Sequence, residues 1–359
     1  MKELGWTARL EQAFAPHRAA GLEPARVAVE HKSLYVLYTA RGEIQATLTG
    51  RLRRDAARKS DLPAVGDWVA VRDPAAARGT AGRATIHAVL PRTGAFVRKA
   101  AGRGTDEQVV AANVDTVFVV TAVDGDVNAR RLERYLALAW ESGAQPVLVL
   151  SKADLEQHPA DTDAAIAAVS LGVPTHRVSA VTGAGLADLR GHLAGGRTVA
   201  LLGSSGVGKS TLVNALLGTA RQAVAELRAD GTGRHTTARR ELIPLPPPAG
   251  GLLLDTPGMR ELQLWEVDAG LAEAFREIRA LAPGCRFRDC GHDGEPGCAV
   301  AAAVAAGTLP ADRLASYRKL QAELRHLEAR ADPRAAAARK RDARVANKAL
   351  NARLKGKHR

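Results

Sequence analysis

Aromatic residues, cysteine and methionine are scarce in this sequence. Phe, Trp and Tyr together make up 4% of its 359 residues, and there are three Cys and two Met. So few aromatic rings argue against base stacking as the main contact with any nucleic acid and favour recognition of phosphate and shape. No apolar run approaches the roughly 20 residues of a membrane-spanning helix, so we expect no membrane partner.

The three cysteines are close together and do not suit disulfides. Cys285, Cys290 and Cys298 form, with His292, the pattern C-x4-C-x-H-x5-C. An odd cysteine count fits a metal site better than bridges, and no signal peptide is recognisable, so we expect a cytoplasmic, thiol-reducing setting. Three thiolates and one imidazole are typical of structural zinc and leave no position for a catalytic water. The alternative is three unrelated buried thiols.

Basic residues outnumber acidic ones. Lys and Arg number 51 against 38 Asp and Glu, which gives a formal net charge of +13 and predicts a polyanionic partner. The length predicts two or three domains, and 46% hydrophobic residues suffice for real cores. From Ala331 to Arg359 there are 10 Lys and Arg against two Asp, which indicates a helix that forms on RNA or, alternatively, a solvated tail.

A phosphate-binding loop of the form G-x-x-x-x-G-K-S/T follows the apolar strand Thr198–Leu202 and precedes the helix pattern Thr211–Leu217. The loop consists of Gly203, Ser204, Ser205, Gly206, Val207, Gly208, Lys209, Ser210 and Thr211. Its glycines let backbone N–H groups face phosphate oxygens at the start of a helix. Lys209 is expected to reach the β- and γ-phosphates, and the Ser210 hydroxyl suits Mg²⁺.

A second phosphate-side element, Asp255-Thr256-Pro257-Gly258, follows the apolar run Gly251–Leu254. Asp255 is expected to hold Mg²⁺ through water, and the Gly258 N–H to meet the γ-phosphate. Between the two elements lies the polar, Gly-rich segment Gly231–Thr237, which we expect to be mobile. We favour Thr237 over its neighbour Thr236 as a Mg²⁺ ligand that depends on the γ-phosphate; an ordinary flexible loop is the alternative.

Base recognition is assigned to two short segments, each after a predicted strand. They are Ser151, Lys152, Ala153 and Asp154, and then Ser179 and Ala180. The Asp154 carboxylate can accept from guanine N1–H and the exocyclic amine, a donor pair that adenine lacks. Lys152 can lie along the base, and a backbone N–H at Ser179-Ala180 can meet the guanine O6. The alternative for Ser151–Asp154 is a plain helix-start turn.

The base-recognition segment precedes the phosphate loop, whereas in an ordinary GTPase it comes last. With this rotated order, Val65-Gly66-Asp67-Trp68-Val69, Gly233-Arg234-His235-Thr236-Thr237 and the Cys/His cluster, the chain resembles the RsgA family of bacterial circularly permuted GTPases over nearly its whole length. The resemblance implies an OB-fold, a permuted G domain, a zinc domain, GTP hydrolysis stimulated by the small (30S) ribosomal subunit, and a role in late maturation of that subunit. The chain departs from the family at Ser151, where Asn is usual, which bears on nucleotide affinity.

The element pattern predicts a multidomain α/β protein, which we expect to be a monomer. We expect an OB-fold RNA-binding domain over 1–99, a permuted doubly wound G domain over 100–262, a helical zinc domain over 263–330 and a basic tail over 331–359. Residues 1–99 look all-β, with strands Val27–Glu30, Ser33–Tyr38, Glu43–Leu48, Asp67–Val71 and Ala84–Leu90. From Asp115 strands and helices alternate, and after Met259 the chain turns helical, with Leu271–Leu281 and Asp312–Arg330. The loop Gly50–Lys59 is a candidate RNA contact or a solvated charged loop.

The residue after Gly258 is Met259, where many GTPases place a water-orienting Gln. We therefore expect slow intrinsic hydrolysis, completed by a partner. His235 is the candidate for positioning the water, with contact to RNA or solvent as an equal alternative. The leading hypothesis is a GTPase that acts as an assembly checkpoint on the small subunit and binds 16S rRNA. An RNA-binding module with GTP as a structural ligand is the alternative, and an ATP-dependent kinase is disfavoured by the base segment.

Overall fold

The structure, a computed structural model, describes residues 1–31, 33–73, 83–99, 107–124, 127–170, 172–219, 240–247, 250–255 and 268–331. The chain divides into two compact units, residues 1–263 with 269–274, and residues 264–268 with 275–359. Each unit is described by itself. The four predicted domain ranges stay a prediction. Within the described residues no helix has the length and apolar character needed to cross a bilayer.

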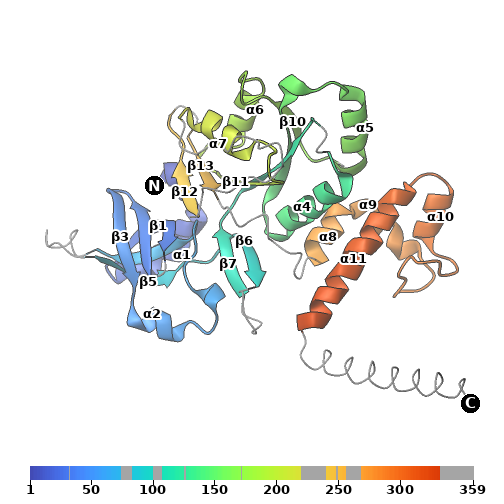
Figure 1. Cartoon of the computed structure of the whole chain (residues 1–359). Coiled ribbons are helices and arrows are strands. Elements are labelled where there is room, and N and C mark those ends of the chain that lie inside the picture. The colour runs from blue at the N-terminus through green and yellow to red at the C-terminus, as the bar shows by residue number, and fades with distance from the viewer. Residues whose placement is uncertain are drawn as a thin grey trace, which may run out of the picture. The chain divides into compact units, whose positions relative to one another are not determined.

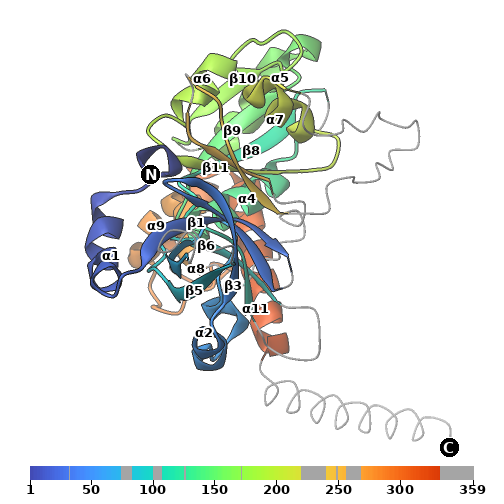
Figure 2. The ribbon, with the colours of Figure 1, turned by 90° about the vertical axis from the view of Figure 1, so that its left-hand side faces the viewer.

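The first unit begins with a closed five-stranded barrel (Figures 1 and 2). Its strands are β1 (Glu23–His31), β2 (Leu34–Thr39), β3 (Gly42–Leu48), β4 (Trp68–Arg72) and β5 (Ala84–Val89). They pair in the order β1-β2-β3-β5-β4, and β4 pairs back to β1, so the barrel has no free edge between these strands. Alternate residues such as Val27, Leu37, Val69 and Ile86 fill the interior. The predicted barrel is confirmed.

The expectation that residues 1–99 are all-β is wrong at two places. Helix α1 (Ala8–Ala19) begins at Thr7, whose Oγ1 accepts from the Leu10 N–H, and it packs Phe14 on the outside of the barrel. Helix α2 (Gly50–Asp55) occupies the segment predicted as a basic loop, and Thr49 caps it in the same way. In both cases a Thr side chain stabilises the first turn of a helix that the pattern of apolar residues did not indicate.

Six further strands form the α/β part of the first unit and continue the sheet of the barrel, through a pairing of Val29 in β1 with Glu241. They are β8 (Thr116–Ala122), β9 (Gln145–Ser151), β10 (Thr175–Val178), β11 (Thr198–Gly203), β12 (Glu241–Pro244) and β13 (Leu252–Asp255). The order is β10-β9-β8-β11-β13-β12, and all pairs are parallel except β12–β13. The sequence predicted every parallel strand here but not β12, nor the separate hairpin of β6 (Ala95–Lys99) and β7 (Glu107–Ala112).

Helices cover both faces of this sheet (Figure 1). They are α4 (Ala129–Glu141), α5 (Pro159–Ser170), α6 (Leu186–Gly191) and α7 (Lys209–Leu217). The face that carries Phe118, Val120 and Leu201 packs against Leu189 of α6 and Leu216 of α7. Helix α4 covers the other face and packs on α5. The predicted doubly wound architecture is confirmed.

The remaining helices are α8 (Asp268–Ala274), α9 (Arg276–Leu281), α10 (Ala299–Ala305) and α11 (Ala311–Ala331). The single helix predicted over Leu271–Leu281 is two helices, because Phe275 between them has non-helical torsions (φ −123°, ψ 42°). Its ring is fully buried, lies 5.3 Å from the Tyr317 ring and carries the Arg313 guanidinium 4.1 Å above it. Burial of that one ring accounts for the break.

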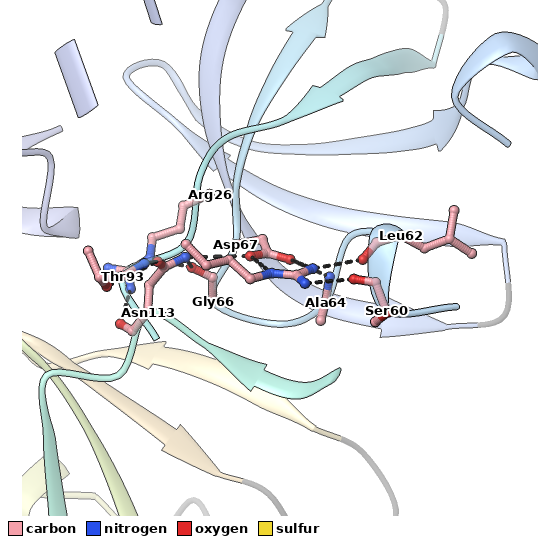
Figure 3. Close-up of polar contacts among 9 residues, drawn as sticks. Arg26, Ser60, Leu62, Ala64, Gly66, Asp67, Thr93 and Asn113 are labelled. Carbon is pink, nitrogen blue, oxygen red and sulfur yellow. Dashed lines mark hydrogen bonds and ion pairs between the residues drawn. The ribbon is translucent and has the colours of Figure 1, made fainter. Parts of the chain in front are cut away.

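A buried arginine links the barrel to the start of the P-loop strand, and Figure 3 shows it beside Gly66 and Asn113. Arg26 of β1 is 2% exposed and donates to the carbonyls of Leu4, Gly66 (3.2 Å) and Asn113 (3.2 Å). It also donates to Thr198 Oγ1 at 2.7 Å, at the first residue of β11. Burial lowers the pKa of Arg26 to about 10, so the guanidinium stays charged at neutral pH.

Asp67 extends this network on the barrel side (Figure 3). It is fully buried and accepts from the Ala64 N–H (2.8 Å) and from Arg92 Nε (2.8 Å) and Nη2 (2.7 Å). Arg92 also donates to the carbonyls of Ser60 (2.6 Å) and Leu62 (2.9 Å). The Asp67 charge is therefore balanced by a forked ion pair, and it helps to balance Arg26.

Replacing Arg26 with Met should destabilise the first unit by about 2–4 kcal/mol, because several buried carbonyls lose their donor at once. Arg26→Lys should recover little, since an ammonium cannot span the four acceptors. Urea unfolding followed by Trp fluorescence measures the effect. The control is Arg72→Met on the neighbouring strand, whose exposed side chain makes one long contact (3.4 Å) and should cost under about 0.5 kcal/mol. Equal losses in both variants would contradict the structural role of Arg26.

Candidate functional site

The predicted nucleotide segments meet at one edge of the α/β sheet. Parallel pairing aligns Ser151 with Ala122 and with Val178, and aligns Gly203 with Val120. Asp255 ends β13, the other neighbour of β11. Because the carboxyl ends of parallel strands share an edge, the phosphate loop, both base segments and Asp255 lie together there.

The phosphate loop has the backbone that its glycines predict. Gly206 and Gly208 have positive φ (81° and 89°), and Gly208 is the residue from which α7 begins. A Cβ on Gly203 would lie 2.3 Å from the Val120 carbonyl oxygen, so only Gly fits at the end of β11. Lys209 donates from Nζ to the carbonyls of Gly203 (2.8 Å) and Ser204. The lysine is thus held over the loop in which a phosphate would sit.

Ser151 occupies the last position of β9 and is 6% exposed. Its Oγ lies 2.6 Å from the carbonyl oxygen of Val207 in the phosphate loop and 3.1 Å from that of Thr121. The Ser151 carbonyl in turn accepts from the Val123 N–H at 3.1 Å. The side chain at this position therefore joins the base segment to the phosphate loop directly, without Asn.

The rest of the base segment is a short 3-10 turn, η3 (Ala153–Leu155). The local backbone therefore resembles the helix-start turn given above as the alternative, and this does not decide whether the segment binds a base. Lys152 has a left-handed backbone (φ 57°), and its Nζ lies 2.7 Å from Asp124 Oδ2. Asp154 is exposed at the sheet edge. Asp154 is thus accessible to a ligand, which its predicted role requires.

The second base segment is a closed turn after β10. The Ser179 N–H donates to the Ala184 carbonyl (3.0 Å), and Ser179 Oγ accepts from the Thr182 N–H (3.1 Å). Gly185 closes the turn, since a Cβ there would lie 2.2 Å from the Arg177 carbonyl. Ala180 follows on this rigid turn, beside the end of β9.

Asp255 has an unusual electrostatic setting. Burial first, and then the charge of Glu241, raise the pKa of Asp255 from 3.8 to about 6, while Lys209 acts in the opposite direction. Glu241 lies directly opposite Asp255 across the β12–β13 ladder. Two carboxylates on facing positions repel each other, so this edge favours a cation. Sequence analysis did not identify Glu241 because it did not predict strand β12.

Other predicted site residues lie outside the described residues. They are His235, Thr236, Thr237 and Gly258, along with the basic tail beyond Ala331. Their assigned roles stay predictions.

The second unit brings together Cys285, Cys290, His292 and Cys298, whose ligand atoms all lie within 4.8 Å of one another. His292 Nδ1 is 3.6 Å from Cys285 Sγ and 3.5 Å from Cys298 Sγ, and those two sulfurs are 3.9 Å apart. Tetrahedral zinc with ordinary Zn–S and Zn–N bonds requires edges of about 3.5–3.8 Å. The donor set and spacing are thus consistent with structural zinc.

Neighbouring groups fix this cluster. The Glu295 carboxylate accepts from the N–H groups of Gly291 (2.7 Å) and Asp293 (2.6 Å), which clamps the turn that carries His292 in a left-handed conformation (φ 60°). Cys298 caps α10, and its Sγ accepts from the Ala301 N–H (3.3 Å). Both contacts favour the ligand geometry, and the cysteine spacing alone did not reveal them.

Comparison with known proteins agrees with this geometry. The sequence matches the RsgA GTPase family over residues 89–265. It is 52% identical over 339 residues to the small ribosomal subunit biogenesis GTPase RsgA of Opitutus terrae, covering 93% of this chain and 92% of that protein. It is 44% identical to the protein of that name from Syntrophotalea carbinolica, covering 95% and 94%. The chain belongs to the RsgA family of GTPases. The predicted resemblance is confirmed.

Solved structures agree with the fold. The crystal structure of YjeQ from Thermotoga maritima matches with a TM-score of 0.64 and 26% identity, covering 84% of this chain and 98% of that one. YloQ, described as a circularly permuted GTPase, matches with a TM-score of 0.62 and 24% identity, covering 85% and 96%. The rotated motif order of this RsgA-family chain is therefore a circular permutation.

Replacing Asp255 with Asn should stabilise the nucleotide-free protein at pH 7.5 by about 1–3 kcal/mol. The folded-state pKa of about 6 exceeds the ordinary 3.8, so ionisation costs the folded state stability. That cost is absent below about pH 4 and complete above about pH 6. Thermal unfolding at pH 4.5 and 7.5, without Mg²⁺, should show a clearly larger gain of the variant at the higher pH. The control is Asp161→Asn, an exposed carboxylate of α5, for which no such pH-dependent gain is expected.

The Cys/His cluster should hold one zinc per chain. Cys290→Ser should lower the bound zinc, measured by elemental analysis of purified protein, and should destabilise the second unit because metal binding contributes to its folding. His158→Ala, at an exposed histidine far from the cluster in sequence, is the control and should leave the zinc content unchanged. Full-length protein with reduced cysteines and no zinc would contradict the assignment.

Proposed function

We propose that this chain hydrolyses GTP in the biogenesis of the small ribosomal subunit and acts as a late maturation checkpoint. Relatives 52% and 44% identical over nearly their whole length are named small ribosomal subunit biogenesis GTPases. The observation that carries the proposal for this chain is the direct bond between Ser151 of the base segment and Val207 of the phosphate loop. It supports one nucleotide site built from two motifs whose bonded residues lie 56 positions apart in the sequence.

The proposed nucleotide contacts follow from the positions at the sheet edge. Lys209 exchanges its present carbonyl acceptors for phosphate oxygens, and Ser210, at the start of α7, supplies a hydroxyl to Mg²⁺. Asp255 holds the same ion through water, for which it has to be ionised. We assign Thr237 as the further Mg²⁺ ligand and the Gly258 N–H as the γ-phosphate contact, both on sequence grounds.

Guanine specificity is assigned to two groups on the base side. The exposed Asp154 carboxylate accepts the N1–H and the exocyclic amine, and the Ala180 N–H donates to O6. The ion pair of Arg177 with Glu156 (2.8 Å) supports this arrangement, because it joins β10 to the end of the η3 turn. Adenine would leave the carboxylate without its donor pair.

The small ribosomal subunit and its 16S rRNA are the proposed partners, met by a monomer in the cytoplasm. The net charge of +13 favours contact with phosphate. On the barrel, Arg53, Arg54 and Arg58 are exposed on α2 and the segment after it. The basic tail from residue 331 adds eight net positive charges by sequence, 10 basic residues less two acidic ones. We therefore propose that basic side chains of the protein contact the phosphates of the RNA backbone.

Stimulation by the small subunit is the property that separates this proposal from its alternative. Met259 stands where many GTPases have a water-orienting Gln, so slow intrinsic hydrolysis is expected. We assign His235 to position the water once the partner is bound. If the chain were instead an RNA-binding module with GTP as a structural ligand, the subunit would bind without accelerating turnover.

The test is phosphate release from GTP with and without purified small subunits. We expect stimulation of at least about tenfold, lost in His235→Ala. In Asp154→Asn, turnover should shift from GTP to xanthosine triphosphate, whose 2-oxo group accepts from an amide, while stimulation persists.

Lys209→Ala is the control for contaminating hydrolases and should abolish release under all conditions. Subunit binding without stimulation would favour the RNA-binding module. Unchanged GTP preference in Asp154→Asn would contradict the base assignment, and unchanged stimulation in His235→Ala would contradict the role of that histidine alone.

A further inference from the structure

Within the described part of the chain, the hydroxyl of Ser151 has two hydrogen-bond contacts, both with backbone carbonyls. Val207 O lies at 2.6 Å and Thr121 O at 3.1 Å from Ser151 Oγ. Carbonyl oxygens only accept, whereas a serine hydroxyl has a single proton to donate. Since the side chain is 6% exposed, the proton is committed inside the protein, with the shorter contact to the phosphate loop preferred.

This commitment limits what Ser151 can offer to a base. Once its proton points at Val207, the oxygen retains only lone pairs, so it can accept but not donate. The imidazole edge of guanine presents N7 and O6, which are both acceptors. Two acceptors do not form a hydrogen bond, so Ser151 has no favourable polar contact with that edge. An Asn amide differs, because its two N–H groups could serve a carbonyl and N7 together.

The neighbouring polar side chains are also engaged within the protein. Lys152 Nζ lies 2.7 Å from Asp124 Oδ2, and the pair is two-thirds or more buried. Ser179, 1% exposed, has its Oγ in the turn contact with the Thr182 N–H. The Lys152 ammonium is thereby directed at Asp124, and the Ser179 oxygen acts as an acceptor within its own turn. We assign base recognition to Asp154 and the Ala180 N–H.

Building on the proposed GTP site, we propose that Ser151 is a positioning residue that ties the phosphate loop to the base segment and leaves guanine N7 unrecognised. Discrimination then depends on N1, the exocyclic amine and O6. The site should accept guanine nucleotides altered at position 7 as readily as GTP itself. Ser151 affects affinity through the loop that holds the phosphates, and it does not select the base.

The decisive probe is 7-deaza-GTP, in which a C–H group replaces N7. Full-length protein is titrated with GTP and with 7-deaza-GTP in competition against a fluorescent GDP analogue, with Mg²⁺ present. We expect the two Kd values to agree within about twofold, because no hydrogen bond is lost. GTP binding tenfold or more tighter than 7-deaza-GTP would overturn the proposal. This comparison uses the unaltered chain, so it does not depend on the folding of any variant.

Two substitutions then separate the bridge from base selection. Ser151→Ala should weaken GTP and 7-deaza-GTP in parallel, by about fivefold, and release both faster, because the bond to Val207 is lost. Ser151→Asn should retain the GTP binding that Ser151→Ala loses, and it should create a preference of about fivefold for GTP over 7-deaza-GTP. A changed GTP to 7-deaza-GTP ratio in Ser151→Ala would contradict the assigned division of roles.

Failure of this inference is distinguishable from failure of the proposed function. If neither GTP nor 7-deaza-GTP displaces the fluorescent GDP, the GTP site itself is wrong. If GTP binds and 7-deaza-GTP does not, the site stands and only the role given to Ser151 falls. Asp154→Asn serves as the control, since it should weaken both nucleotides equally and so show that the base occupies the site.

Discussion

The buried guanidinium of Arg26 constrains the first unit more than any other single group. It remains charged at neutral pH, because burial lowers its pKa only to about 10. A buried charge is tolerated only when it is hydrogen-bonded, and its acceptors come from separate parts of the chain, among them Gly66, Asn113 and Thr198. Any rotation of the barrel against the sheet would leave this charge unsatisfied. Barrel and sheet are therefore coupled at the base of the strand that leads to the phosphate loop.

The circular permutation determines which parts of the chain lie next to the phosphate-loop strand. The P-loop strand β11 lies between β8 and β13. The chain enters the sheet through β8, directly after Asn113 and Asp115, and Asp115 Oδ2 accepts from the Thr198 N–H at 2.7 Å. It leaves the sheet through β13, which ends in Asp255. Strand β8 thus follows directly on the segment that precedes the sheet, and β13 leads directly into the segment that follows it. An unpermuted order would not place both neighbours of the phosphate-loop strand at these two positions in the chain.

Sequence reasoning succeeded where a local pattern carried the signal. The buried parallel strands are continuous apolar runs, the phosphate loop needs its glycines, and the spacing of the cysteines and His292 indicates their cluster. It failed where tertiary contacts decide: β12 is four residues long and lies between β13 and β1, and Phe275 breaks a helix through its burial. Arg26 and Glu295 were missed for the same reason, because most of their partners are backbone groups that no side-chain pattern reveals.

Ser151 shows how a departure from a family pattern separates two roles that one side chain normally combines. The amide that is usual at this position has donors enough for both a loop and a base, whereas the hydroxyl has one. In the structure that proton is directed at the Val207 carbonyl, so Ser151 holds the phosphate loop to the base segment and adds no base contact. This order is physically reasonable: the phosphate loop supplies many contacts, including the start of α7 and Lys209, and all of them depend on its position. A single base hydrogen bond contributes only about 1 kcal/mol by comparison.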